Sequence, residues 1–360
     1  MHTGLLGPPG SSAVLFVAHT ERPITEAEEK GYRKMCAASR KMVVFYACLC
    51  YDDELTFRGE MMRKKRPFGC LYFLIGLLFL VMFWYWQNYT LQIVRYTLSY
   101  AELPQGFDGY KIAHISDMHG MAFGYKNSTL ARRIREFNPD IVVCTGDMIS
   151  SHAKDGQAFL DFLESMGDQY PIYMCLGNHE QIAEWKELES ESEYGYDAFI
   201  RKVREYGVRI LNNETEILEK DGDQIRIIGL TLALYHYSRR DEPYADENLL
   251  LKTPYIEEAV GRAGEGFNLL LVHNPSYFRE YTAWGADLIL VGHMHGGVIR
   301  IPFKGGLLSP EHVFFPEFDA GLFEEGTGKM IVNRGLGNSA IQMRLFNRPE
   351  LTEITLKSVP

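Results

Sequence analysis

Apolar residues are distributed unevenly along this chain of 360 residues, and the most apolar stretch lies within its first quarter. No charged residue occurs from Phe68 to Trp86, where Leu, Phe, Ile and Val predominate. An α-helix of this length, rising about 1.5 Å per residue, is about 28 Å long, close to the hydrocarbon thickness of a bilayer. The basic run Arg63–Arg66 precedes it, and the aromatic run Trp84–Trp86 ends it, as at a membrane–water boundary. The pattern therefore predicts a transmembrane helix rather than a buried core helix.

The charges beside this helix predict its orientation. Basic residues precede the helix and none follows it closely, so the N-terminal side is expected in the cytoplasm. The rest of the chain is then extracytoplasmic, which predicts a single-pass protein of the plasma membrane. No small-x-small cleavage site follows the apolar stretch, and an uncleaved anchor is therefore favoured over a signal peptide.

The first 61 residues do not share this organisation. They contain a turn-rich start and an apolar run, Met42 to Tyr51, that is too short to span a bilayer. Met61 and Met62 directly precede the basic run, where a signal anchor could begin. We therefore divide the chain into a tail (1–61), a basic flank with the transmembrane anchor (62–88) and a domain (89–360). The tail is either an extension of the reading frame or a poorly ordered segment, which the intact mass of the native protein would distinguish.

Beyond the anchor one arrangement recurs, in which a short apolar run of strand length ends in residues that can bind a metal. Continuous apolar runs favour strands buried on both faces, as in a sheet covered by helices. A first strand is expected within Thr90–Leu98, and a helix from Asn127 or Ser128 to Asn138-Pro139. The five runs and their polar ends are Lys111–Ser116 before Asp117 and His119, Ile141–Cys144 before Asp147, Ile172–Leu176 before Asn178 and His179, Leu269–Val272 before His273, and Leu288–Val291 before His293 and His295.

Side chains at the carboxyl ends of such strands are expected to meet, because loops from several strands converge there. Two divalent metals about 3.5–4 Å apart can clamp a phosphate for in-line attack, and they need a bridging carboxylate with oxygen and imidazole ligands. Neighbouring glycines let the backbone approach closely. This ligand set suits Mn, Fe, Zn or Ni without choosing among them. The seven candidate metal ligands are Asp117, His119, Asp147, Asn178, His273, His293 and His295.

Composition excludes several classes of protein. The apolar fraction of 46% is that of a folded protein with a core. The formal net charge of −10 at pH 7 gives no reason to expect binding to nucleic acid. Six cysteines without a CxxC pair do not indicate a disulfide scaffold or a zinc ribbon. Cys144 and Cys175 precede metal motifs at strand ends and are expected to be free, buried thiols.

From Lys111 to the C-terminus the chain resembles the calcineurin-like metallophosphoesterase superfamily. Its segments Arg334–Gly337 and Arg344–Glu350 are similar to those of membrane-anchored or exported bacterial phosphodiesterases. The resemblance implies an α/β fold, a four-layer αββα sandwich of two mixed sheets, preceded here by the transmembrane helix. The motifs that carry it are Asp117-x-His119, Gly146-Asp147, Gly177-Asn178-His179-Glu180, His273 and Gly292-His293-x-His295.

The resemblance also implies roles for these residues. His179 would be catalytic, as a general acid or charge stabiliser near the leaving group. The implied activity is that of a dinuclear metallophosphoesterase, specifically a phosphodiesterase, in which a hydroxide bridging two metals attacks phosphorus in line. The alternatives are a pyrophosphate hydrolase of the UDP-2,3-diacylglucosamine type acting on envelope lipid, and a catalytically silent metal-binding membrane protein. The implied ligands are Asp117, His119 and His295 for the first metal, Asn178, His273 and His293 for the second, and Asp147 as the bridge.

Two segments depart from the family pattern. No arginine closely follows Gly146-Asp147, which disfavours protein phosphatase activity because serine/threonine phosphatases of the superfamily bind phosphate with one there. Gly229–Tyr237 replaces a Gly-x-Asp-Asp turn that is common in relatives. An ordinary strand and loop is favoured there over a substrate-facing loop in which His236, Arg239 or Arg240 meets phosphate. The substrate is therefore predicted only as a phosphoester, with lipid and cell-envelope compounds as options.

Overall fold

The computed structural model describes residues 69–151, 156–187, 195–237, 251–338 and 343–359. All of them belong to one compact unit, Phe68–Pro360. The predicted tail over 1–61, the basic run Arg63–Arg66, Arg239 and Arg240 lie outside the described residues.

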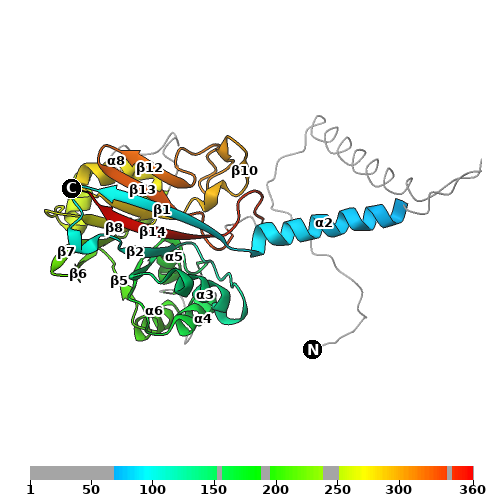
Figure 1. Cartoon of the computed structure of the whole chain (residues 1–360), viewed down its shortest axis with the longest axis horizontal. Coiled ribbons are helices and arrows are strands. Elements are labelled where there is room, and N and C mark those ends of the chain that lie inside the picture. Colours follow the sequence, from blue (N-terminus) through cyan, green and yellow to red (C-terminus); the bar gives the residue numbers. More distant parts are fainter. Residues whose placement is uncertain (1–68, 152–155, 188–194, 238–250, 339–342, 360) are drawn as a thin grey trace, which may run out of the picture. The chain divides into compact units, whose positions relative to one another are not determined.

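The first described element is the helix α2 (Gly69–Tyr89), shown in blue in Figure 1. Its stretch Leu71–Tyr89 is long and apolar enough to cross a membrane, and only 11% of that window is buried. Leu, Phe and other large apolar side chains are exposed along most of its length. A helix that is apolar on all sides has no face suited to water. The apolar helix expected over Phe68–Trp86 is therefore present, with its end three residues later.

The first of two six-stranded sheets has the strand order β1-β14-β2-β3-β4-β5. β2 to β5 are parallel, whereas β14 is antiparallel to β2 and parallel to β1. The predicted first strand is β1, which directly follows α2. The bounds are β1 (Gln92–Tyr100), β2 (Lys111–Ile115), β3 (Ile141–Thr145), β4 (Ile172–Cys175), β5 (Arg209–Ile210) and β14 (Glu350–Ser358).

The second six-stranded sheet has the order β12-β13-β9-β8-β7-β6 and is also mixed. Its central strands β7, β8, β9 and β13 are parallel, and its two edge strands are antiparallel to their neighbours. A separate hairpin pairs β10 (Arg300–Ile301) with β11 (Gly305–Gly306). The bounds are β6 (Glu214–Lys220), β7 (Asp223–Leu230), β8 (Asn268–Val272), β9 (Leu288–Val291), β12 (Gly321–Glu325) and β13 (Gly328–Val332).

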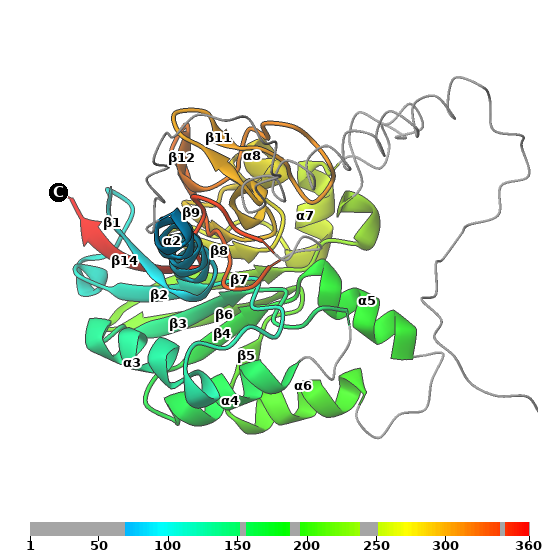
Figure 2. The same ribbon diagram turned by 90° about the vertical axis from the view of Figure 1, so that its right-hand side faces the viewer.

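Helices cover the outer face of each sheet, as Figure 2 shows in a view along α2. The helices α3 (Ser128–Phe137), α4 (Gln157–Met166) and α6 (Tyr196–Glu205) pack on the first sheet, and α7 (Thr253–Val260) and α8 (Phe278–Trp284) pack on the second. Among the described residues, the apolar core accordingly forms three layers: one beneath each set of helices and one between the sheets. This arrangement confirms the four-layer αββα sandwich.

The core explains why the strands are continuously apolar. In β3, Val142 and Cys144 face the helices while Ile141 and Val143 face the second sheet. Successive side chains of a strand point to opposite faces, and here both faces are buried. The same alternation holds in β8, where Leu270 packs against α7 and α8 and its two neighbours pack between the sheets.

Two smaller predictions, the bounds of one helix and the buried thiols, also hold in the structure. α3 begins at Ser128 and ends before Asn138, which adopts a left-handed conformation. Cys144 and Cys175 are buried and free. His114, which alternates into β2, is buried and lies 2.8 Å through Nε2 from the hydroxyl of Thr145. Burial lowers the pKa of His114 to about 3, so the ring is neutral and serves the packing of the sheet.

Candidate metal centre

The ends of β2 and β9 bring three of the predicted ligands together. Asp117, His119 and His295 each offer one ligand atom, and these atoms lie within 4.8 Å of one another. His119 Nε2 is 3.1 Å from His295 Nε2, which is 3.3 Å from Asp117 Oδ1. Asp117 and His119 follow β2 of the first sheet, whereas His295 follows β9 of the second.

A second group forms at the ends of β3, β8 and β9, where ligand atoms of Asp147, His273 and His293 lie within 4.8 Å of one another. His273 Nδ1 donates to the carbonyl of Thr145 at 2.6 Å, so Nε2 is the atom presented to Asp147 Oδ2, at 3.0 Å. Asp147 Oδ2 is also 3.7 Å from His119 Nε2 of the first group. Asp147 therefore lies between the two groups.

One buried ligand atom beside this second group has no hydrogen-bond partner among the described residues. It is Asn178 Oδ1, at the start of α5 (Asn178–Glu187). Leaving a buried polar atom unsatisfied costs about 1–3 kcal/mol, and such atoms are rare in folded proteins. A divalent cation would satisfy this atom, and the mixed oxygen and imidazole donors of the whole set fit a transition metal.

The backbone at the candidate ligands is strained in a consistent way. A positive φ is uncommon for residues other than glycine and costs on the order of 1–3 kcal/mol when the surroundings enforce it. Strain of this kind gathers at functional sites, where it aims side chains at a ligand. Five of the seven candidate ligands have a positive φ: Asp117 (49°), His119 (46°), Asp147 (57°), His293 (69°) and His295 (47°).

Two glycines allow the ligand loops to pack this closely. A Cβ atom on Gly177 would collide with Asp147 Oδ1, and one on Gly292 would collide with the side chains of Ser116 and Asp117. Any larger residue at either position would displace a carboxylate of the site. The close backbone approach expected beside the ligands is therefore present at both glycines.

Glu180, to which the sequence patterns assigned no role, ties two ligand loops together. Its carboxylate accepts hydrogen bonds from the backbone N–H groups of Asp147 (2.8 Å), Met148 (2.7 Å) and Gly177 (2.9 Å). Burial and the neighbouring charge of Asp147 raise the pKa of Glu180 to about 7, while the backbone donors oppose that rise. Glu180 thus holds the loops after β3 and β4 in register.

The electrostatics of the centre favour bound positive charge. Burial lowers the pKa of His119 to about 3 and that of His295 well below its ordinary value, so both rings keep lone pairs for a metal. Burial opposes charge on His273 as well, but Asp147 and Asp117 outweigh it and raise its pKa to about 10. Burial also raises the pKa of Asp117. Two buried carboxylates therefore draw in a cation, which a metal ion can supply in place of a proton.

Glu311 is a member of the site that sequence reasoning missed. Its carboxylate accepts a hydrogen bond from His293 Nε2, which leaves Nδ1 as the ring nitrogen for a metal. Burial opposes ionisation of Glu311, but His293 outweighs it and lowers the pKa of the carboxyl group to about 2. A carboxylate behind a ligating histidine fixes the orientation and tautomer of its ring. No local signal marks Glu311, since acidic residues in loops are common.

A cavity of about 480 Å³ lies over the two groups of ligands and is lined by His179, Glu311 and His312 among others. The side chain of His179 is 33% exposed, and its Nε2 lies 3.9 Å from Asp147 Oδ2. Its Nδ1 lies 2.5 Å from the hydroxyl of Ser151, in the segment that lacks the arginine of protein phosphatases. The ring is therefore held at one nitrogen and presented to the cavity.

The segment Gly229–Tyr237 reaches the cavity through a residue that was not predicted. Gly229 and Leu230 complete β7, as expected for an ordinary strand. His236 is buried, and its ring packs edge-on against Tyr255 and Tyr277. Tyr237 instead lines the cavity, with its ring centroid 5.1 Å from that of His293. Of the residues proposed to meet phosphate, His236 therefore faces the protein interior.

The C-terminal segment connects α2 to the ligand loops. Asn88, near the end of α2, accepts a hydrogen bond from Arg344 N at 2.7 Å. The guanidinium of Arg344 donates to the carbonyl of Gly337, and His295 Nδ1 lies 3.3 Å from the same oxygen. Asn347 donates to the carbonyl of His295 at 2.6 Å. The motif that resembled exported phosphodiesterases therefore supports one of the candidate ligands.

The chain is similar to several known proteins. The family model described as calcineurin-like phosphoesterase matches residues 110–297. The uncharacterized metallophosphoesterase YkuE of Bacillus subtilis is 28% identical over 280 residues, which covers 76% of this chain and 88% of that protein. The phosphodiesterase YaeI of Escherichia coli is 25% identical over 269 residues, which covers 74% of this chain and 88% of that protein. The phosphopantetheinyl hydrolase structure from Mycobacterium tuberculosis has a TM-score of 0.38 at 14% identity, covering 63% of this chain and 89% of that one.

Proposed function

Because this chain belongs to the calcineurin-like phosphoesterase family, we propose that this dinuclear metallophosphoesterase is a phosphodiesterase. The observation that carries the proposal is the position of Asp147 between two groups of ligands, each with its own histidines. The similarity to a protein named as a phosphodiesterase supports a diester substrate. A cavity of about 480 Å³ above the ligands has room for a second substituent on the phosphate.

The residues of this chain would hold two divalent cations. When bound, the cations supply Lewis acidity that activates water and neutralises the charge of the phosphate. The identity of the metals is open among Mn, Fe, Zn and Ni, since the donors suit each of them. We assign Asp117, His119 and His295 to one cation, Asn178, His273 and His293 to the other, and Asp147 to both.

His179 is the residue that we assign to proton transfer. The hydroxyl of Ser151 holds Nδ1, and the ring lines the cavity beside Asp147. Nε2 is then placed to donate a proton to the departing oxygen of the substrate, which needs one when the leaving group is a poor one. Glu311 has a positioning role, because its hydrogen bond fixes the ring of His293.

Removal of metal tests the proposed activity. We expect a chelator to reduce hydrolysis of bis(p-nitrophenyl) phosphate by the full chain more than about 100-fold, because the phosphate charge is then left without a counter-charge. Added Mn²⁺ should restore the rate, measured as released nitrophenolate. The monoester p-nitrophenyl phosphate is the comparison substrate and should be cleaved more slowly. Metal binding without turnover of either substrate would favour the catalytically silent alternative instead.

We further propose that α2 anchors the catalytic domain to the plasma membrane with the domain outside the cytoplasm. The support is the exposed apolar surface of α2 and the basic run Arg63–Arg66 that precedes it. Protease added to intact cells that express the full chain should then remove the domain, as detected on an immunoblot. A cytoplasmic marker protein should survive the same treatment. A domain that is cleaved only after the cells are lysed would reverse the orientation.

A further inference from the structure

Four phenylalanines project into solvent from one region of the domain. Phe303 is fully exposed, and Phe314, Phe346 and Phe315 are 68%, 53% and 49% exposed. Phe303 lies in the tip of the β10–β11 hairpin. Isolated exposed apolar residues are normal, but a group of large ones on a soluble surface usually marks a binding site.

The segments that carry these side chains are paired with one another. Ile299 forms a bridge with Leu345, and Arg300 N donates to the carbonyl of Leu345 at 3.0 Å. Leu308 forms a bridge with Phe314. Backbone pairing therefore joins the hairpin, the loop after it and the turn at Phe346 into one structure, which we call the aromatic platform (residues 299–315 and 343–347).

Three of the four exposed phenylalanines have a left-handed backbone conformation. Phe303, Phe315 and Phe346 have φ values of 67°, 52° and 54°. A left-handed conformation is unfavourable for a bulky side chain, and burial of these rings does not compensate for it. Strain that exposes three aromatic rings indicates that the rings serve contact with something outside the domain.

The contact between the aromatic platform and α2 indicates which partner the exposed rings bind. The ring of Phe346 lies 6.0 Å from that of Phe83, and the guanidinium of Arg348 lies 4.8 Å over the ring of Trp86. Phe83 is six residues before the end of α2 at Tyr89, a rise of about 9 Å. With α2 across the bilayer, Phe346 therefore lies at the depth of the membrane interface.

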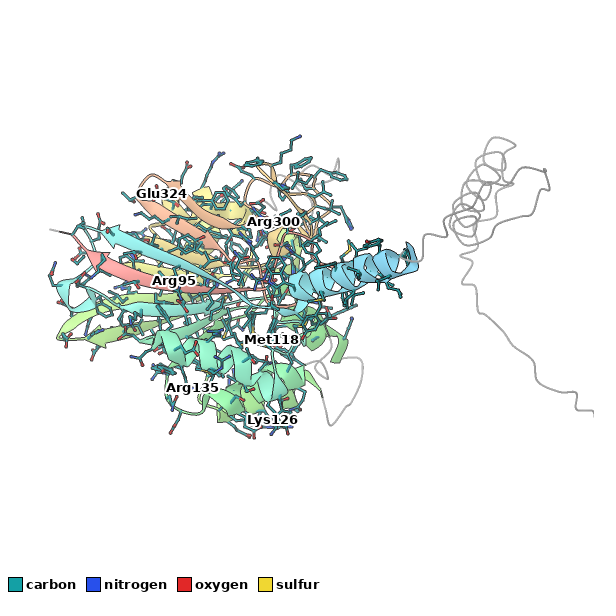
Figure 3. The ribbon with its side chains drawn as sticks, turned by 45° about the vertical axis from the view of Figure 1, so that its right-hand side comes forward. Arg95, Met118, Lys126, Arg135, Arg300 and Glu324 are labelled. Atoms are coloured by element: carbon teal, nitrogen blue, oxygen red, sulfur yellow. The ribbon has the colours of Figure 1, made fainter. Side chains whose placement is uncertain are left out.

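Other features fit the same partner. Lys304, next to Phe303, is exposed, and a cation beside an aromatic ring suits a lipid headgroup layer. Figure 3 shows Arg300, the first residue of β10, at the end of the domain from which α2 emerges, whereas Glu324 of β12 lies farther from it. Val298, Leu308 and Pro310, from the platform and the residue before it, also line the catalytic cavity.

We propose that the aromatic platform is a membrane-contact surface that inserts Phe303 and its neighbours into the lipid headgroup layer. The cavity, which the platform borders, then opens beside that layer, and the substrate class is a phosphodiester carried by a lipid. The proposal rests on the membrane anchor and phosphodiesterase activity proposed above. Amphipathic aromatic surfaces bind at this depth because the rings are buried while the polar backbone stays hydrated.

The direct test places a fluorescent probe at the tip of the hairpin. Full chain in vesicles would carry Phe303→Cys labelled with an environment-sensitive dye, with Cys36, Cys48, Cys50 and Cys70 replaced by serine. Cys144 and Cys175 are buried and can stay. Lipids with a nitroxide near the headgroup should quench the dye strongly. The outcome does not depend on any activity, so it separates this proposal from the proposed function.

The matched control carries the same dye at Val359, which is 38% exposed. β1 and β14 run in parallel from Gln92, next to α2, to Ser358, a distance of about 26 Å. The dye at Val359 should therefore escape quenching. Equal, weak quenching at both positions would overturn the proposal. It would also be overturned if light scattering showed that the chain self-associates in detergent and that this association shields the dye at position 303.

A second measurement concerns the substrate. The double variant Phe303→Ser with Phe314→Ser should raise the KM for a lipid-linked nitrophenyl phosphodiester in vesicles by about tenfold, since two rings leave the interface. Hydrolysis of soluble bis(p-nitrophenyl) phosphate should be unchanged, because neither ring lines the cavity. A KM for the lipid-linked substrate that stays unchanged in the folded variant would contradict the assignment of substrate class.

Discussion

Replacing Asp147 by asparagine is expected to abolish hydrolysis, with kcat for an activated phosphodiester falling at least about 1,000-fold. Asp147 Oδ2 lies 3.0 Å from His273 Nε2 and 3.7 Å from His119 Nε2, so one carboxylate serves both groups of ligands. An amide has nearly the same shape but no charge, and it bridges two cations poorly. The bound metal, measured per chain by mass spectrometry, should fall from two ions to one or fewer.

The contrasting variant is Glu311→Gln, which also removes a carboxylate from the cavity. Its side chain can still accept the hydrogen bond from His293, so the ring stays oriented and activity should fall by less than about tenfold. Metal content should stay near two ions per chain. If Asp147→Asn retained both ions and most of its activity, the shared position of Asp147 would have no catalytic meaning.

Replacing His179 by alanine should lower kcat about 100- to 10,000-fold while leaving the metal content unchanged. The ring lies at the cavity and is held by Ser151, but it belongs to neither pair of histidines assigned to a cation. A general acid matters most when the leaving oxygen is basic. The loss should therefore be large for an alkyl phosphodiester and small for a nitrophenyl one, as measured by kcat on both substrates.

Ser151→Ala is the control for this variant, because it removes the hydrogen bond to Nδ1 and keeps the ring. We expect a loss of about tenfold or less, with the same dependence on the leaving group. A loss for His179→Ala that is equal for both substrates would identify His179 as a charge stabiliser. An unchanged rate would remove His179 from the mechanism.

The buried strands that end in candidate ligands could be predicted from local sequence patterns, because both faces of each strand are covered. Ile141–Cys144 and Leu269–Val272 are apolar throughout, and in the structure their side chains alternate between two layers of core. Polar residues at the ends of such strands cannot be explained by packing, which made Asp117, Asp147 and the histidines visible as candidate ligands. The apolar helix was visible because the sequence there is apolar on every side of a helix.

The contacts that complete the site could not be predicted from local sequence patterns. Glu311 and His293 are 18 residues apart in the sequence, and Arg344 and Asn88 are 256 residues apart. Both contacts therefore depend on the path of the backbone through the whole fold. Ser151 and Tyr237 belong to residue types that are common in loops and carry no pattern of their own. Their roles follow only from the neighbours that the fold supplies.

The chain by itself therefore determined the five strands that end in candidate ligands, that one helix is apolar on every side, and which residues could bind metal. The tertiary structure decided that the five strand ends belong to two different sheets and that Asp147 lies between two groups of ligands. It also decided that the exposed ring of Phe346 lies against Phe83 of α2. The physical reason is range: burial and periodicity act between near neighbours along the chain, whereas a metal centre and a surface are made by residues that meet only after the sheets have packed.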